Sequence, residues 1–181
     1  MGEELSRAGE LFIASWEGFR PTPYNDAAGH ATIGYGHLIS LGPVVRADLE
    51  RVYVKGAKPG QVTRVQALEL LHSDANAAMS AVRQHIKVAL TQAQIDALIS
   101  FGYNLGPGCV AQIAPVINSK PRRWRLLAFR RWHMRVAATL IQYDHAGDQV
   151  LPGLLRRRRA EACLFNSSKY TRASGNPYAN S

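Results

Sequence analysis

The sequence predicts an α+β, mainly helical fold, in which a small N-terminal β-hairpin lobe and a helical C-terminal lobe are joined by a long helix. Apolar residues recur at helical spacing over most of the chain. Turn-forming residues interrupt this spacing between Phe19 and Tyr35. A long helical pattern then follows Thr63. With 181 residues and 46% hydrophobic content, the chain can bury one core as a single domain.

The first helix and the hairpin are indicated by a change of pattern at Gly18. Apolar residues at helical spacing run from residue 3 to Glu17, and Gly18 stands where that helix would end. The segment from Phe19 to Tyr35 then reads PTPY, NDAAGH and ATIGY, which is typical of two short strands joined by a turn. We expect a hairpin here, extended by a third strand beyond Gly36.

The later elements are predicted to be helices. Thr63 is a good N-cap for a helix over about 63–86, long enough to bridge two lobes. Thr91 caps the next helix, which ends at Gly106, and a final helix follows the turn at Pro152. Residues 110–145 are helix-like but irregular. The expected division is an N-terminal lobe over about 1–62, the inter-lobe helix, a C-terminal lobe over about 87–165, and a loosely ordered polar tail over 166–181.

Composition narrows the class of partner and the compartment. A formal net charge of +9 favours binding to polyanions, such as nucleic acid, anionic lipid or acidic envelope polymers. Cys109 and Cys163 have no paired-motif spacing, so we expect two buried free thiols and neither a disulfide nor a zinc site. The N-terminus lacks the pattern of a signal peptide, and no apolar run is long enough for a membrane span. We therefore expect a cytoplasmic protein.

Glu17, Asp26 and Thr32 are the candidate catalytic residues. The expected elements place Glu17 at a helix end, Asp26 at the tip of the first strand and Thr32 on the returning strand, so the three can converge. The negative end of the helix dipole and the neighbours Trp16 and Phe19 favour the protonated carboxyl of Glu17, which suits a general acid. Asp26, in a turn rich in backbone donors, should stay ionised, as cleavage by paired carboxylates requires.

Each of these residues also has an ordinary structural interpretation. A glutamate at a helix end is usually solvated, and an aspartate before a glycine-containing turn usually caps that turn. Thr32 is a common strand residue. His37 alone is more typical of a hydrogen-bonded structural histidine than of a base or a metal ligand.

The run EGFRPTPYNDAAGHATIGYGH closely resembles the catalytic segment of the phage-type lysozymes, or endolysins. In that family a Glu is followed nine residues later by an Asp and six further on by a Thr, within E-G-x-R-x-x-x-Y-x-D and T-I-G-x-G-H. The resemblance continues through VTRVQALELLHSDANAAMSAVRQHI, ALISFGYNLGPG and AGDQVLPGLLRRRRAEACLF, and so covers most of the chain. The residues that fall on the catalytic pattern are Glu17, Arg20, Tyr24, Asp26, Thr32, Ile33, Gly34, Gly36 and His37.

This resemblance implies a lysozyme-like fold and hydrolysis of the β-1,4 bond between N-acetylmuramic acid and N-acetylglucosamine in peptidoglycan. Glu17 would protonate the glycosidic oxygen, while Asp26 and Thr32 hold a water that attacks the opposite face, with inversion. Neither a metal nor an organic cofactor is implied.

The resemblance also implies supporting and substrate-binding residues. His37 would meet Asp74 as a structural ion pair. Arg20, or one of the arginines at 156–159, could pair with Glu17, and the residues alone do not choose between them. The expected substrate-binding residues are Tyr24, Tyr35, Asn104 and Gly106.

Its biological setting is implied as well. We expect a monomer in the host bacterial cytoplasm that reaches the periplasm and cell wall at lysis. Because the sequence shows no export signal, release would need a membrane-permeabilising partner such as a holin.

Between Val110 and Ala138 the chain departs from the family pattern, and RRW occurs twice in PRRWRLLAFRRWHMR. A spacing of eight residues would let the two tryptophans share a helix face. One interpretation is an extended helix with solvated arginines and tryptophans that cover the core. The other is an interfacial segment that contacts an anionic membrane or lipopolysaccharide. The residues concerned are Arg122, Arg123, Trp124, Arg130, Arg131 and Trp132.

Three alternatives to the muramidase interpretation remain. The first is a cationic envelope-disrupting protein that acts through the RRW segment, with a cleft that is not essential. The second is a nucleic-acid binder, which is suggested by the net charge alone. Because the sequence contains no motif for reading bases, we expect no nucleic-acid partner. The third is a hydrolase of chitin-like polymers.

Overall fold

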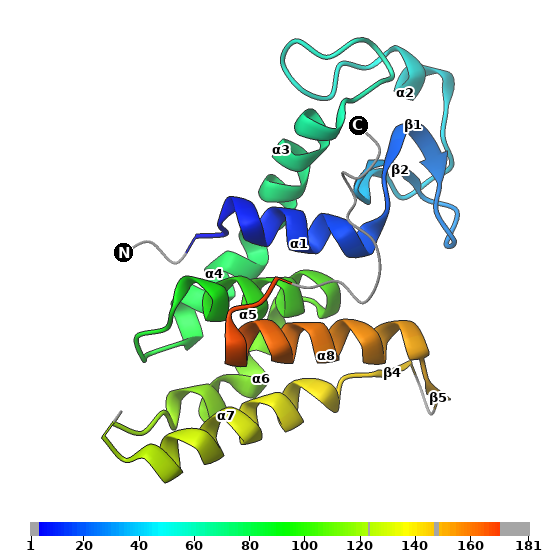
Figure 1. Cartoon of the computed structure of the whole chain (residues 1–181). Helices are drawn as coiled ribbons and strands as arrows, with labels where there is room; N and C mark the ends of the chain where they lie inside the picture. Colours follow the sequence, from blue (N-terminus) through cyan, green and yellow to red (C-terminus); the bar gives the residue numbers. More distant parts are fainter. Residues whose placement is uncertain (1–3, 123, 147–148, 171–181) are drawn as a thin grey trace. The chain divides into compact units, whose positions relative to one another are not determined.

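The computed structural model describes residues 4–122, 124–146 and 149–170 (Figure 1). Its element order confirms the predicted α+β, mainly helical class. The elements are α1 (Arg7–Glu17), β1 (Arg20–Asn25), β2 (Ala31–Gly34), β3 (His37–Ser40), α2 (Arg46–Glu50), α3 (Arg64–Asp74), α4 (Asn76–His85), α5 (Gln92–Leu105), α6 (Pro107–Asn118), α7 (Leu126–Ile141), β4 (His145–Ala146), β5 (Gln149–Val150) and α8 (Pro152–Ser167).

The chain divides into two compact units. The sheet unit runs from Ile13 to Asp74. The helical unit joins the segment that ends at Phe12 to the segment that begins at Ala75. The division therefore falls inside α1 and after α3, rather than near residue 62 as the sequence suggested. The C-terminal tail from residue 171 onward lies outside the described residues.

The sheet unit is built on three antiparallel strands in the order β1-β2-β3. Tyr24 pairs with Thr32 across β1 and β2. Every residue of β2 is buried, and α3 packs against this strand. Gly34 has φ +69° and approaches Ala67 of α3 so closely that an added Cβ would lie 3.0 Å from the Ala67 Cβ. A larger residue at position 34 would crowd Ala67, so a glycine is needed here. This close approach lets α3 pack directly against the sheet.

The single long helix predicted over 63–86 is wrong, because the structure contains two helices interrupted at Ala75. Thr63 caps the first as expected: its Oγ1 accepts the Gln66 N–H at 3.2 Å, and the Gln66 side chain accepts the Thr63 N–H at 3.0 Å. Ala75 has ψ −8°, far from the helical value near about −42°. The hydrogen-bond ladder breaks there, at the junction between the two units.

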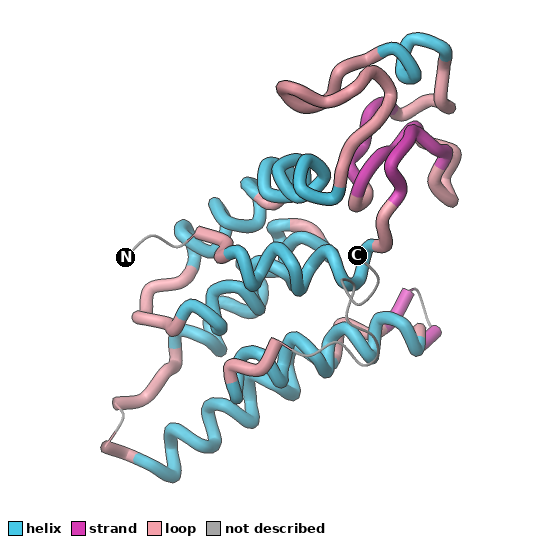
Figure 2. Tube along the Cα trace, turned by 45° about the horizontal axis from the view of Figure 1, so that its top comes forward, coloured by secondary structure: helices cyan, strands magenta, loops and turns pink. Residues whose placement is uncertain are grey.

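The helical unit has α5 at its centre. Residues Ala93 to Gly102 of this helix are all buried, and α4, α6 and α8 pack around it (Figure 1). Thr91 caps α5 as predicted, since its side chain accepts the Gln94 N–H, and the helix ends before Gly106 at φ +90°. Helix α7 lies along α8, as Figure 2 shows. The segment expected to be irregular thus forms two helices, α6 and α7.

The two tryptophans of the RRW repeats do not share a helix face. Trp132 is only 2% exposed, and its indole N–H donates to the carbonyl of Val116 at 3.0 Å. Trp124 is 71% exposed and precedes α7, which begins at Leu126. The predicted common face is wrong because the helical period does not extend back to Trp124. Arg123, which precedes Trp124 in the first repeat, lies outside the described residues.

The structure bears on the expectations about the two cysteines and about membrane-spanning segments. Cys109 and Cys163 are free thiols as expected, but both are half-buried rather than buried. Within the ranges that the structure describes, none of the helices has the length and apolarity to cross a membrane.

Candidate active site

Glu17 is the last residue of α1, and the backbone turns sharply after it. Gly18 adopts φ +71°, a left-handed conformation that ends the helix without a steric penalty for a side chain. The first strand then begins at Arg20. The Glu17 side chain is half-buried. This local sequence therefore places a carboxyl at the carbonyl end of a helix and directs the next residues into the hairpin.

Asp26 is held by the turn that joins β1 to β2. Its Oδ1 accepts the backbone N–H groups of Ala28 and His30, each at 2.8 Å. The turn is closed by the Asp26 N–H, which donates to the His30 carbonyl at 2.9 Å. The His30 backbone donor is the main cause that holds the pKa of Asp26 below its usual value, and Ala28 adds to it. This direction agrees with the expectation that Asp26 stays ionised, which remains a prediction.

His30 was not among the residues that the sequence singled out. Its ring Nδ1 lies 3.6 Å from the Asp26 Oδ2, and its N–H and carbonyl both bond to Asp26. The sequence does contain a signal for His30: it follows Asp26 by four residues, across a turn that contains Gly29. His30 holds the carboxylate in a fixed orientation and, when charged, favours its ionised form.

Tyr24 lies close to both candidate carboxyls. Burial is the main cause that raises its pKa, Arg20 lowers it, and the charges of Asp26 and Glu17 both raise it again. The Arg20 guanidinium is 5.8 Å from the centre of the Tyr24 ring. The charges of both candidate carboxyls therefore influence one phenol.

Thr32 lies on β2 and pairs directly with Tyr24 of β1. It is only 3% exposed, and its hydroxyl donates to the His30 carbonyl at 3.1 Å. That bond fixes the hydroxyl and leaves the oxygen lone pairs as acceptors.

Tyr35 packs into the core of the sheet unit. It is 3% exposed, and its ring packs against Phe19 with ring centres 5.3 Å apart. Its expected contact with substrate stays a prediction.

The expected contact between His37 and Asp74 is present. The His37 Nδ1 lies 3.0 Å from each carboxylate oxygen of Asp74. The pair connects β3 to the end of α3 and is half-buried. It braces the sheet unit next to the candidate site.

Asn104 and Gly106 belong to the helical unit, at the end of α5. The Asn104 side-chain oxygen accepts from Arg158 at 2.9 Å. Arg157 and Arg158, two of the arginines considered as partners of Glu17, both form ion pairs with the buried Glu161. Gly106 supplies the backbone reversal between α5 and α6.

The described residues contain no cluster of three His, Cys, Asp or Glu side chains arranged to hold a metal ion. A helix-end glutamate, a hairpin aspartate held by backbone donors and an α5-centred helical unit are the features of the lysozyme-like fold. The family model described as phage lysozyme matches residues 14–161, and the chain belongs to this family.

Solved structures share this fold over nearly the whole chain. An endolysin from the Escherichia coli O157:H7 phage FAHEc1 is 28% identical with a TM-score of 0.69, over 93% of this chain and 96% of that one. A mutant of P22 lysozyme is 27% identical with a TM-score of 0.68, over 91% of this chain and 99% of that one.

Curated relatives are named endolysins. The endolysin of Bacillus phage PZA is 32% identical over 91% of this chain and 55% of that protein. The endolysin of Salmonella phage P22 is 29% identical over 91% of this chain and 99% of that protein. The chain spans about half the length of the Bacillus phage PZA and B103 endolysins, 55% and 53% respectively.

Proposed function

We propose that the chain is an endolysin that hydrolyses the β-1,4 bond between N-acetylmuramic acid and N-acetylglucosamine in bacterial peptidoglycan. The observation that carries the proposal is that the Asp26 Oδ1 accepts two backbone N–H groups at 2.8 Å in the hairpin turn, in the hairpin that directly follows the helix ending at Glu17. Glycoside hydrolysis requires one carboxyl that can donate a proton and one that stays charged. Membership of the phage lysozyme family and the endolysin relatives support the same chemistry.

In the proposed reaction, Glu17 donates its proton to the glycosidic oxygen as the bond to the anomeric carbon breaks. Asp26 accepts a proton from a water that attacks this carbon from the opposite face, and Thr32 orients that water through its oxygen. After the product leaves, Asp26 releases to solvent the proton that it took from the water, and Glu17 takes up one proton from solvent, so both carboxyls return to their starting forms. Attack from the opposite face inverts the anomeric configuration. Proton NMR of the first product would show the inverted anomer; a retained anomer would refute this step.

Substrate contacts are proposed for Tyr24, Asn104 and Gly106. Tyr24 offers a half-buried phenol beside both carboxyls. Asn104 offers an amide group whose oxygen is already held by Arg158. Arg20, His37 and Asp74 are proposed as supports rather than as reacting groups, because their contacts are with other side chains of the sheet unit.

We also propose that the protein acts as a monomer and starts in the host cytoplasm, from which a holin-type partner releases it to the cell wall. Cells that express the chain alone should stay intact and should lyse when the inner membrane is permeabilised chemically. Lysis without permeabilisation would contradict this route.

The central test is the clearing of outer-membrane-stripped Gram-negative cells by the wild type and by Glu17→Gln, with mass spectrometry of the released fragments. Removing the general acid should lower the rate by roughly a hundredfold or more. Glu69→Gln, an exposed change on α3 of the same unit, is the matched control and should keep full activity. Fragments from the wild type should carry muramic-acid reducing ends.

The competing proposal is a cationic envelope-disrupting protein. It predicts that Glu17→Gln clears cells as fast as the wild type and that no reducing ends are released. That result would overturn the hydrolase proposal. Release of only N-acetylglucosamine reducing ends would instead indicate that the substrate is a chitin-like polymer.

A further inference from the structure

The outward face of α7 has an unusual composition for a solvent-exposed helix. Its inward residues Trp132, Val136 and Leu140 are buried. On the opposite side, Leu127 is 73% exposed and Met134 is 70% exposed. These two residues are seven apart, so they lie on one line along a helix that turns by about 100° per residue. An apolar line therefore runs along the exposed side of α7.

Arginines flank this line on both sides. At about 100° per residue, Arg130 falls on one side of the Leu127–Met134 line, and Arg131 and Arg135 fall on the other. All three arginines are exposed. An exposed apolar centre with cations on both edges is the arrangement of a helix that lies in the surface of an anionic membrane, with its apolar side chains among the acyl chains and its arginines at the head groups.

The segment before α7 extends the same surface. Trp124 is 71% exposed, and the Arg122 guanidinium stacks over its ring at 5.0 Å. Leu126, on the first turn of the helix, is 71% exposed. Tryptophan next to arginine is favoured where an apolar surface meets water at a bilayer.

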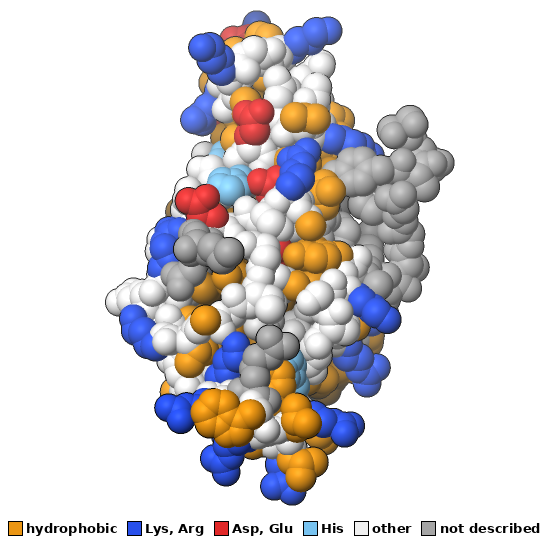
Figure 3. Space-filling model, turned by 60° about the vertical axis from the view of Figure 1, so that its left-hand side comes forward, with side chains coloured by type: hydrophobic (Ala, Val, Ile, Leu, Met, Phe, Trp, Pro, Cys, Tyr) orange, Lys and Arg blue, Asp and Glu red, His pale blue; other side chains and the backbone are white. Residues whose placement is uncertain are grey.

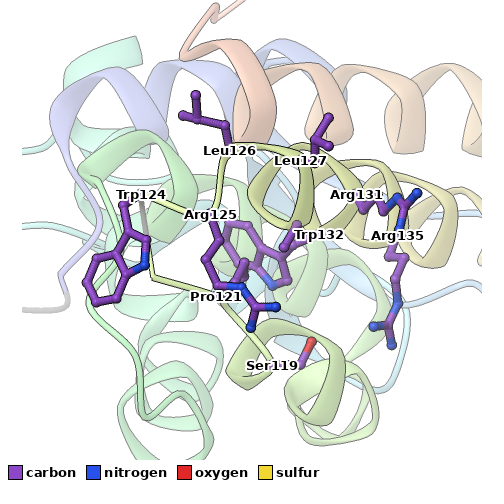
Figure 4. A pocket seen from close by; sticks show the side chains of 10 residues that line it. Ser119, Pro121, Trp124, Arg125, Leu126, Leu127, Arg131, Trp132 and Arg135 are labelled. Atoms are coloured by element: carbon purple, nitrogen blue, oxygen red, sulfur yellow. The ribbon is translucent and has the colours of Figure 1, made fainter.

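A hollow of about 640 Å³ lies between this segment and α7. Figure 4 shows Leu126 and Leu127 on the first turn of α7, with Arg131 and Arg135 further along the helix. Arg125, Arg131 and Arg135 line the hollow together with apolar residues. This combination suits a phosphate-bearing lipid head group with the start of its acyl chain.

The charge of the segment favours an anionic occupant. No acidic residue occurs in the sequence between Asp96 and Asp144, whereas seven basic residues do. In Figure 3, hydrophobic side chains at the lower end of the view lie among lysines and arginines. A surface of one sign attracts anionic lipid head groups and does not by itself attract a neutral membrane.

We propose that the exposed side of α7 and the segment before it form a docking surface for an anionic phospholipid bilayer. This surface is built on Trp124, Leu126, Leu127, Met134 and the flanking arginines. It shares Arg122, Trp124, Arg130 and Arg131 with the RRW repeats but excludes Trp132, which is part of the core. The proposal concerns lipid binding and does not depend on glycosidase activity.

The test is cosedimentation with vesicles of phosphatidylethanolamine and phosphatidylglycerol, beside neutral phosphatidylcholine vesicles. The wild type should bind the anionic vesicles at low salt, lose binding as salt rises, and ignore the neutral ones. Leu127→Ser with Met134→Ser should weaken binding by roughly tenfold or more. Arg130→Gln with Arg131→Gln should do the same.

Matched changes in the sheet unit serve as controls. Leu41→Ser with Leu49→Ser removes two exposed apolar side chains, and Arg46→Gln with Arg51→Gln removes two exposed charges. Both pairs should leave vesicle binding unchanged. All four double variants replace exposed residues, so their thermal unfolding should match the wild type. Hydrolysis of isolated peptidoglycan should also be unchanged in the α7 variants, which separates failure of this proposal from failure of the hydrolase proposal.

Tryptophan fluorescence gives a second readout. Binding should shift the emission to shorter wavelength, and Trp124→Phe should remove most of this shift because the other indole of the segment, Trp132, is already buried. The proposal is overturned by any of three results: no binding to anionic vesicles, binding that the α7 variants do not weaken, or binding to lipopolysaccharide or DNA alone.

Discussion

Asp26 obtains its charge state from three adjacent groups in the chain rather than from the surrounding protein. The N–H groups of Ala28 and His30 point at one carboxylate oxygen, and the His30 ring stands near the other. Such donors stabilise only the ionised form. A hairpin turn is therefore sufficient to prepare the charged partner that a pair of catalytic carboxyls needs.

An NMR titration of the native protein should show the Asp26 carboxyl with a midpoint below its ordinary value of 3.8. Because the folded pKa is lowered, these bonds stabilise the fold above the ordinary value, and this contribution is lost as the pH falls through the folded pKa. The difference in stability between the wild type and Asp26→Asn should accordingly shrink in that acidic window. A midpoint at or above 3.8 would contradict the hydrogen-bond assignment.

At the scale of elements, the loop between α2 and α3 is shaped by glycines in the left-handed region. Gly60 has φ +64°, its N–H donates to the Arg51 carbonyl at 2.9 Å, and an added Cβ would overlap the Leu49 carbonyl of α2. Gly56 has φ +80° but open space around the same position. A side chain at Gly56 would therefore cause backbone strain alone, whereas a side chain at Gly60 would cause both backbone strain and steric overlap.

Gly60→Ala should destabilise the protein more than Gly56→Ala. Backbone strain alone should cost about 1 kcal/mol at Gly56. At Gly60 the overlap must also push the loop away from α2, so the cost should exceed about 2 kcal/mol. Thermal unfolding of the two variants beside the wild type measures the difference. Equal effects would mean that the loop yields freely at Gly60.

At the scale of the whole molecule, the helical unit is assembled from both ends of the described chain. The carboxylate of Asp96, fully buried on α5, accepts the Ser6 N–H at 3.0 Å, the Gln92 side chain at 2.9 Å and the Tyr170 hydroxyl at 2.7 Å. Gly9 leaves room for this carboxylate, since an added Cβ would lie 2.6 Å from the Asp96 Cγ. One buried acid therefore ties the first and last described segments to the central helix.

This arrangement predicts a loss of stability at high pH. Burial first, and then the bond to Asp96, raise the pKa of Tyr170 to about 12. Because the folded pKa lies above the unfolded one, the contribution is complete below the ordinary value of 10.0 and is lost as the pH rises through about 12. Tyr170→Phe should remove this component of the alkaline unfolding curve. A difference absorbance titration of the two proteins should place the missing tyrosine near pH 12, and a midpoint near 10.0 would refute the contact.

Prediction from the sequence succeeded where the signal is local. Thr91 and Thr63 were predicted as helix caps, and Gly18 and Gly106 as helix ends, because caps and terminating glycines act on backbone groups within a few residues. The hairpin and the ionised Asp26 follow from the same local chemistry. Thr32 pairs with Tyr24 across the hairpin, and the catalytic roles of Glu17 and Thr32 remain proposals.

The tertiary structure alone decided the remaining features. Trp132 is buried because Phe165, a ring from a distant segment, packs on it, and periodicity cannot report such a partner. The break at Ala75 follows the division into two units, which depends on what α3 and α4 each pack against. The sequence by itself thus determined the caps, turns and charged hairpin, since each depends on neighbours in the chain. Burial and unit boundaries required the folded molecule, because they depend on contacts between residues far apart in the chain.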